Sequence, residues 1–109
     1  MNPIKYAIEF ANNIVNKFSD KIIAVILYGS VARGDYTMDS DIDLLVILED
    51  FSIKMAKDIA GEQFKILVKT GVEISAKVYG YNDFNKFKKI KTPFMEEVLR
   101  DGVILYGKI

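Results

Sequence analysis

Residues 22–48, IIAVILYGSVARGDYTMDSDIDLLVIL, hold two apolar runs on either side of a polar turn. The first run, Ile22–Tyr28, is apolar throughout and rich in β-branched residues, so it predicts a buried strand. The second, Asp41–Leu48, becomes apolar after its first carboxylates and predicts another strand. Gly29 follows the first strand directly, and Ser30–Gly34 is expected to open a short helical turn. We expect the fold to be built around these two strands.

The rest of the chain predicts helices and two further strands. Apolar periodicity, capping residues and glycine stops place a helix from Asn2-Pro3 to Phe18, a helix over Phe51–Thr70 stopped by Gly71, a strand over Val72–Tyr79, a helix from Asn82-Asp83, a helix over Phe94–Arg100 after Pro93, and a short edge strand over Val103–Tyr106. This order predicts an α/β (α+β) fold, with about four strands and helices packed on the sheet. We expect one domain over residues 1–109.

Two of these elements also predict which side chains point inward. The inner face of the helix over Phe51–Thr70 is expected to carry Ile53, Ala56, Ile59, Ala60, Phe64 and Leu67. The strand over Val72–Tyr79 alternates, which predicts one covered face and one polar face. The covered face would hold Val72, Ile74, Ala76 and Val78, and the polar face Glu73, Ser75, Lys77 and Tyr79.

Composition excludes several kinds of chemistry. The chain of 109 residues has no cysteine and no histidine, so disulfides, thiolate metal sites and thiol nucleophiles are ruled out. An acid–base step must then use a carboxylate, a lysine, a tyrosine or a metal-bound water. Fifteen basic residues balance fifteen acidic ones, which gives no general argument for nucleic-acid binding. The local cluster Lys86, Lys88, Lys89 and Lys91 is read as a solvated helix face in preference to a nucleic-acid or partner contact.

The sequence also bears on location. It has no apolar run near the ~20 residues that span a bilayer. The segment Met1-Asn2-Pro3 does not begin a signal peptide pattern. We therefore expect no membrane association and a cytoplasmic setting.

The turn after the first strand suits a phosphate group. Gly29 lacks a Cβ, so backbone N–H groups can approach an anion closely. Ser30 can cap the following helical turn or donate its hydroxyl to a phosphate oxygen. Arg33, one turn further along, can add a charge-assisted bond. A Gly-Ser turn after a strand is an ordinary turn far more often than a phosphate site, so this signal is weak alone.

Asp41 and Asp43 suit a divalent metal ion. Residues i and i+2 of a strand point to the same side, and two carboxylates there repel unless a cation lies between them. Magnesium prefers oxygen ligands and commonly uses one or two carboxylates together with substrate phosphates. Glu73 would complete a triad able to hold two ions if its strand pairs beside the Asp41 strand. The alternative for Glu73, an exposed glutamate paired with Lys77, is equally supported by the spacing.

Together these residues resemble a known family. Gly29-Ser30, ten residues and then Asp41-x-Asp43 is similar to the nucleotidyltransferase superfamily of DNA polymerase β type. The fuller string, Gly-Ser-x-Ala-Arg-Gly followed by Ser-Asp-Ile-Asp-Leu-Leu-Val, resembles the minimal nucleotidyltransferases, or MNT proteins. The resemblance covers nearly the whole chain, including the closing residues Leu99–Tyr106. The combined motif is far more specific than either half.

The resemblance implies a small mixed sheet and a nucleotidyl transfer. Asp41 and Asp43 would bind magnesium, with Glu73 as the third acidic residue and two ions in the site. Gly29 and Ser30 would contact the triphosphate of ATP, and AMP would move to an acceptor hydroxyl. Such short chains resemble the antitoxins of HEPN/MNT pairs, which implies a helical HEPN toxin as partner and a tyrosine of that toxin as acceptor.

The sequence leaves other functions open. The chain could neutralise its partner by contact alone, with Tyr36, Tyr79, Tyr81 and Phe84 as an exposed aromatic interface, although ordinary core or rim positions explain these residues equally well. It could also transfer nucleotides to a small molecule or to RNA. The balanced charge argues mildly against RNA.

Overall fold

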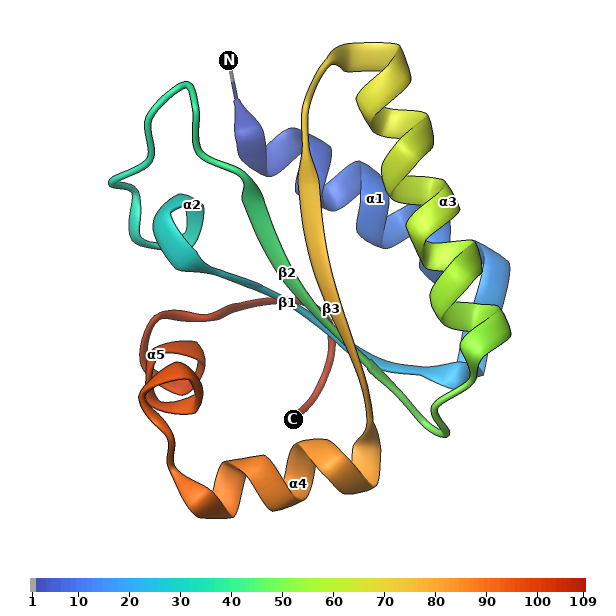
Figure 1. The fold of residues 1–109 in the computed structure, drawn as a ribbon, viewed down its shortest axis with the longest axis vertical. Helices are drawn as coiled ribbons and strands as arrows, with labels where there is room; N and C mark the ends of the chain where they lie inside the picture. Colours follow the sequence, from blue (N-terminus) through green and yellow to red (C-terminus); the bar gives the residue numbers. More distant parts are fainter. Residues whose placement is uncertain (1) are drawn as a thin grey trace.

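The two apolar runs of residues 22–48 form the centre of a four-stranded sheet in the computed structural model, which describes residues 2–109. The strand order is β3-β2-β1-β4 (Figure 1). β1 pairs antiparallel with both β2 and β4, and β2 pairs parallel with β3, so the sheet is mixed as expected. The elements are α1 (Pro3–Phe18), a 3₁₀ helix η1 (Ser19–Lys21), β1 (Ile22–Tyr28), α2 (Gly29–Arg33), β2 (Ile42–Leu48), α3 (Ile53–Thr70), β3 (Ile74–Gly80), α4 (Tyr81–Ile90), α5 (Pro93–Asp101) and β4 (Val103–Gly107).

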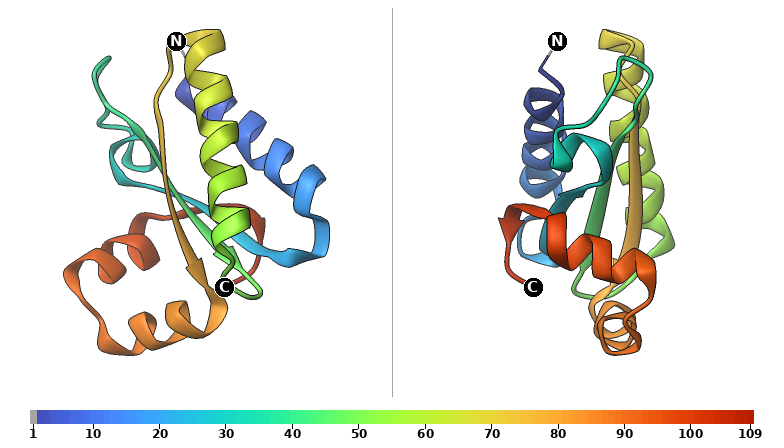
Figure 2. Two further views of the ribbon diagram at one scale, coloured as in Figure 1. Left: turned by 45° about the vertical axis from the view of Figure 1, so that its right-hand side comes forward. Right: turned by 90° about the vertical axis from the view of Figure 1, so that its left-hand side faces the viewer.

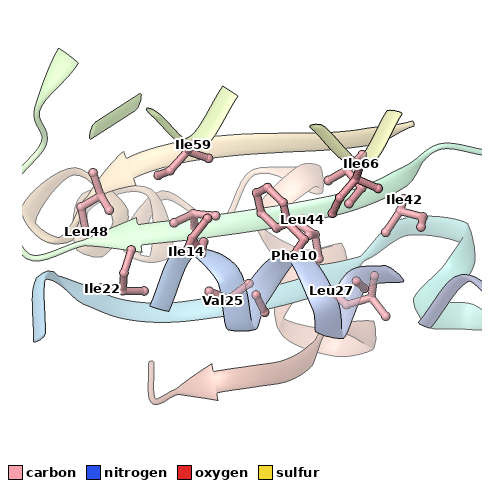
Figure 3. Close-up of a cluster of buried hydrophobic side chains, with 14 of the residues drawn as sticks. Phe10, Ile14, Ile22, Val25, Leu27, Ile42, Leu44, Leu48, Ile59 and Ile66 are labelled. Atoms are coloured by element: carbon pink, nitrogen blue, oxygen red, sulfur yellow. The ribbon is translucent and has the colours of Figure 1, made fainter. Parts of the chain in front are cut away.

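Helices cover both faces of the sheet. α1 and α3 lie on one face, and α4 and α5 lie on the other (Figure 1). Alternate β2 residues serve the two cores, because successive side chains of a strand point to opposite faces. Leu44 and Val46 pack with α1 and α3, while Leu45 and Ile47 pack with α4 and α5. Figure 3 shows the first core, in which side chains of α1 and α3 meet those of β1 and β2.

Local capping signals set the helix ends. The Asn2 side chain accepts a hydrogen bond from the Ile4 N–H at 3.2 Å, with Pro3 at the first helical position of α1. Ser52 caps α3 by accepting from the Met55 N–H at 3.3 Å, so this helix starts at Ile53 and not at Phe51. Gly71 ends α3 in the left-handed conformation, with φ of 77°. These caps satisfy backbone groups that the helix itself leaves without partners.

The predicted inner face of α3 was largely wrong. Ile59 is buried as expected, but Ile53 is 68% exposed and Phe64 is 64% exposed. The buried residues of α3 are Met55, Ile59, Glu62 and Ile66. α3 has apolar residues on two sides, and packing against α1 and the sheet selects the side that includes Glu62. The buried Glu62 carboxylate is compensated by Lys65 at 3.3 Å and Lys17 of α1 at 3.9 Å.

The structure also corrects the prediction for one aromatic residue. Phe84 is completely buried in the core under α4 and so is unable to serve an exposed interface. Tyr36 and Tyr81 are exposed, at 40% and 43%. Tyr79 is half-buried and its ring meets Phe87 edge to face, with ring centroids 5.2 Å apart.

In the part of the chain that the structure describes, no helix is both long and apolar enough to cross a membrane.

Candidate active site

Gly29 and Asp43 meet at one end of the central strand pair. Gly29 begins α2 immediately after β1 and has a φ of +75°, which side-chain-bearing residues rarely adopt. A Cβ at this position would overlap the Asp43 carboxylate and would lie 3.2 Å from its Cγ. Gly29 therefore provides both the turn and the space for the carboxylate, and it brings the start of α2 against Asp43.

Asp43 is the half-buried carboxylate of the site. It lies on β2 opposite Tyr28 of β1. Partial burial raises its pKa above the ordinary value of 3.8, and repulsion from Asp41 raises it further. Lys77 opposes this shift, Glu97 adds to it and Arg33 opposes it weakly. The predicted pair Asp41 and Asp43 is thus close enough for mutual repulsion.

Glu73 does not join this pair in the structure. It is exposed and precedes β3, while its carbonyl accepts a hydrogen bond from the Ile42 N–H at 3.1 Å. The parallel register places Ser75 opposite Asp43 and leaves Glu73 one step outside the ladder, level with Asp41. Among residues 2–109, no group of three acidic, histidine or cysteine side chains is placed to hold a metal ion. The charge of Asp41 acts on Asp43, and Glu73 forms no group of three with them.

Arg33 has acidic partners at both ends of its guanidinium. Its Nε donates to Asp35 at 3.2 Å, and its Nη1 donates to Glu97 of α5. The hydrogen bond to Asp35 is the main cause of a raised pKa for Arg33. The bridge to Glu97 ties α2 to α5, which lie side by side (Figure 2). Arg33 is near the site, but its charge is already engaged.

The aromatic side chains of Tyr28 and Phe94, which lie beside Asp43, were not predicted from the sequence as part of the site. The Tyr28 ring meets Phe94 of α5 edge to face, with centroids 5.3 Å apart. The Lys77 ammonium lies over the same Phe94 ring at 5.2 Å. Burial, and then the charge of Asp43, raises the pKa of the Tyr28 hydroxyl from 10.0 to about 12. The alternation of β3 could have placed Lys77 on this face, whereas Phe94 and Glu97 gave no signal because α5 is distant in sequence.

The donor set of the site fits a hard cation. Two carboxylates close enough to repel are stabilised by a divalent ion between them, and magnesium prefers such oxygen ligands. A cavity of about 650 Å³ lies elsewhere, lined by residues such as Lys17, Glu49 and Phe51. Because Glu49 follows the far end of β2, this cavity is not part of the carboxylate site.

Comparison with known proteins identifies the family. Residues 11–108 match the family model described as polymerase beta, nucleotidyltransferase. The chain is 42% identical over 106 residues to "Putative protein adenylyltransferase MJ0604" of Methanocaldococcus jannaschii, covering 97% of this chain and 100% of that protein.

Solved structures share the fold. A toxin–antitoxin structure with AMP-PNP aligns with a TM-score of 0.61 and 16% identity, covering 93% of this chain and 73% of that one. A Shewanella oneidensis complex of a tri-AMPylated HEPN toxin with an MNT antitoxin aligns at 0.53 and 13%, covering 95% and 72%. The mixed four-stranded sheet agrees with these comparisons. The chain belongs to the polymerase β family and is a nucleotidyltransferase of that family.

Proposed function

We propose that this enzyme transfers AMP from ATP to a tyrosine hydroxyl of a HEPN-type toxin partner in a magnesium-dependent reaction. The observation that carries the proposal is the apposition of Gly29 with Asp43, which sets the turn at the start of α2 directly against a carboxylate that Asp41 repels. The names of the similar proteins support a protein acceptor, because one is called a protein adenylyltransferase and another is bound to an AMPylated toxin.

Asp41 and Asp43 would hold the magnesium ion, which supplies charge neutralisation at the reacting phosphate when bound. Two carboxylates, together with substrate phosphates, commonly hold one such ion. Glu73 is proposed as the third acidic residue, in which case its exposed side chain must turn toward Asp41 when nucleotide and metal are present. A second ion would depend on that movement.

Gly29 and Ser30 would hold the outer phosphates. The absent Cβ at Gly29 lets the backbone approach the nucleotide, and the Ser30 hydroxyl can donate to a phosphate oxygen. Arg33 can add a third contact only by leaving Glu97 or Asp35. Holding the triphosphate in this way would orient the α-phosphorus for attack.

In the transfer step, the acceptor oxygen forms a bond to the α-phosphorus while the bond to the bridging oxygen breaks. Pyrophosphate leaves, and the hydroxyl proton passes to a carboxylate of the site or to solvent. Histidine is absent from the chain, so a carboxylate is the side chain best suited to take this proton. Positioning and charge stabilisation supply most of the rate.

The direct test combines the purified chain, ATP labelled on the α-phosphate, magnesium and the product of the adjacent gene. We expect label on a tyrosine of the partner, located by mass spectrometry, and none with Asp43→Asn or with EDTA. An intact complex without label would contradict the proposal. Full neutralisation of the toxin by Asp43→Asn would instead favour neutralisation by contact alone, and label on RNA or a small molecule would favour those acceptors.

A further inference from the structure

α3 carries an apolar surface that the fold itself does not use. Four large side chains stand on its outer side, and with one small residue they form the outer stripe, defined as Ile53, Ala60, Phe64, Leu67 and Val68. Val68 is 70% exposed, Ile53 and Phe64 are exposed almost as much, and Leu67 is 40% exposed. Steps of three, four or seven residues put these side chains along one side of the helix.

Such a grouping differs from scattered exposed apolar residues. Single apolar side chains on a surface are normal, whereas contiguous groups mark interaction sites. α3 already packs its other side through Ile59 and Ile66, so the stripe adds nothing to the core. Its exposure is the reason that apolar periodicity misassigned the inner face of α3.

The charges around the stripe are of one sign. α3 contributes four lysines to the surface, namely Lys54, Lys57, Lys65 and Lys69. Its two carboxylates are withdrawn, since Asp58 is half-buried and Glu62 is buried. Lys65 pairs with Glu62 at 3.3 Å and Lys69 pairs with Glu9 of α1 at 3.9 Å, although these lysine side chains are 71% and 72% exposed. In residues 2–109 neither Lys54 nor Lys57 has an ion-pair partner, so these two lysines supply the unpaired positive charge of α3. Like charges would repel a second copy of this face, while carboxylates on a partner would be attracted.

The stripe ends at the same end of the sheet as the proposed site. The last turns of α3 lead through Gly71 into β3, which starts beside β2 with Ile74 opposite Ile42. Leu67 and Val68 therefore lie toward the end of the sheet that carries Asp41 and Asp43. They lie on the other face, because Asp43 shares its side of β2 with Leu45 and Ile47, which pack under α4 and α5. A partner held on the stripe would reach the carboxylate pair around β3, which is the edge strand of the sheet.

We propose that the outer stripe docks an amphipathic helix of the acceptor protein, with apolar side chains facing Phe64 and Val68 and carboxylates facing the lysines. This inference rests on the proposed transfer to a protein. The apolar row from Ala60 to Val68 matches a partner helix, because residues at i, i+3, i+4 and i+7 of that helix form a complementary row. Lys57 lies in line with this row, between Ala60 and Ile53. The lysines of α3 favour carboxylates at the flanking positions of the partner helix.

The test measures the affinity of the chain for the toxin partner that accepts the label. We expect the double variant Phe64→Ser, Val68→Ser to raise Kd about tenfold or more, because central apolar residues carry most of the affinity of such contacts. The KM for the partner should rise in parallel, with AMP-PNP binding unchanged. Lys57→Glu should weaken binding mainly at low salt.

The matched control is Ile90→Ser on α4, which removes a side chain of similar exposure, 64%, from the opposite face. It should leave Kd unchanged. All variants should keep the wild-type Tm, since the altered side chains are exposed. An unchanged Kd for the stripe variant would overturn the docking surface while leaving the proposed function intact.

Further outcomes distinguish a partner helix from a membrane surface, and the docking surface from the proposed function. Stripe-dependent sedimentation with vesicles of anionic phospholipid, without any effect on partner binding, would overturn the helix and assign the stripe to a membrane surface. Stripe-dependent partner binding without label transfer would support the docking surface and contradict the proposed function. Failure of the wild-type chain to bind the partner at all would overturn both.

Discussion

Gly29 and Asp43 are in contact across the end of the β1–β2 pair, and the missing Cβ of Gly29 is the space that the Asp43 carboxylate occupies. This contact joins the two halves of the motif, which are separated by a turn, into one site. It also makes the site sensitive to small changes, because backbone conformation, sterics and charge all depend on the same pair.

Gly29→Ala should destabilise the fold and abolish nucleotide binding. The positive φ of Gly29 and the overlap with Asp43 both oppose a side chain. Gly34→Ala is a matched control, because Gly34 has a φ of +83° and a Cβ added there would meet nothing within 4 Å. Backbone strain alone costs about 1 kcal/mol or somewhat more, and Tm falls by about 4–8 °C per kcal/mol in a domain of this size. Equal losses of Tm in the two variants would show that the contact with Asp43 is unimportant.

Asp43→Asn should abolish transfer and stabilise the folded chain at neutral pH. The pKa of Asp43 is raised in the folded state, so ionised Asp43 favours unfolding at pH 7. Wild-type stability should rise, relative to the variant, as the pH falls through this raised pKa. The difference should vanish below the ordinary value of 3.8. Urea unfolding of both proteins at neutral and acidic pH measures this difference in the free energy of unfolding. A variant less stable than wild type at pH 7 would contradict a destabilising charge on Asp43.

Glu97→Gln should improve ATP binding if Arg33 contacts phosphate. Glu97 holds one end of the Arg33 guanidinium, so weakening this ion pair releases a cation beside the triphosphate turn. Arg33→Met should have the opposite effect on ATP affinity. The two changes should cost little stability, since solvent-exposed ion pairs contribute little to it. Titration calorimetry with AMP-PNP measures both, and weaker ATP binding by Glu97→Gln would assign the bridge a positioning role.

Magnesium with AMP-PNP should raise the Tm of the wild-type chain. A ligand that binds only the folded state stabilises it by about 2.7 kcal/mol at one hundred times its Kd. Asp41→Asn should lose most of this gain, because one of the two carboxylates that favour the cation is neutralised. Glu73→Gln should lose part of it only if Glu73 turns toward the metal. Scanning calorimetry with and without EDTA decides these cases, and an Asp41→Asn variant that keeps the full gain would remove Asp41 from the metal site.

Much of this arrangement follows from local sequence. The uninterrupted apolar runs predicted β1 and β2, because only a covered strand gains from apolar residues on both faces. Asn2-Pro3 and Gly71 predicted helix ends, because their effects on φ and on unpaired N–H groups need no distant partner. The cap at Ser52 was not predicted, and the start of α3 was placed two residues early. The i and i+2 spacing likewise predicted that Asp41 and Asp43 share one side.

Tertiary structure decided what periodicity left ambiguous. α3 has apolar residues on two sides, and its packing on α1 and the sheet buried Ile59 and Ile66 while leaving Phe64 exposed. Glu97 came beside Arg33 only because α5 packs on α2. The sequence by itself determined which segments are strands and helices, since this depends on neighbours a few residues apart. Only the tertiary structure decided which helix face is covered and which distant charges reach the site, since these depend on how whole elements pack.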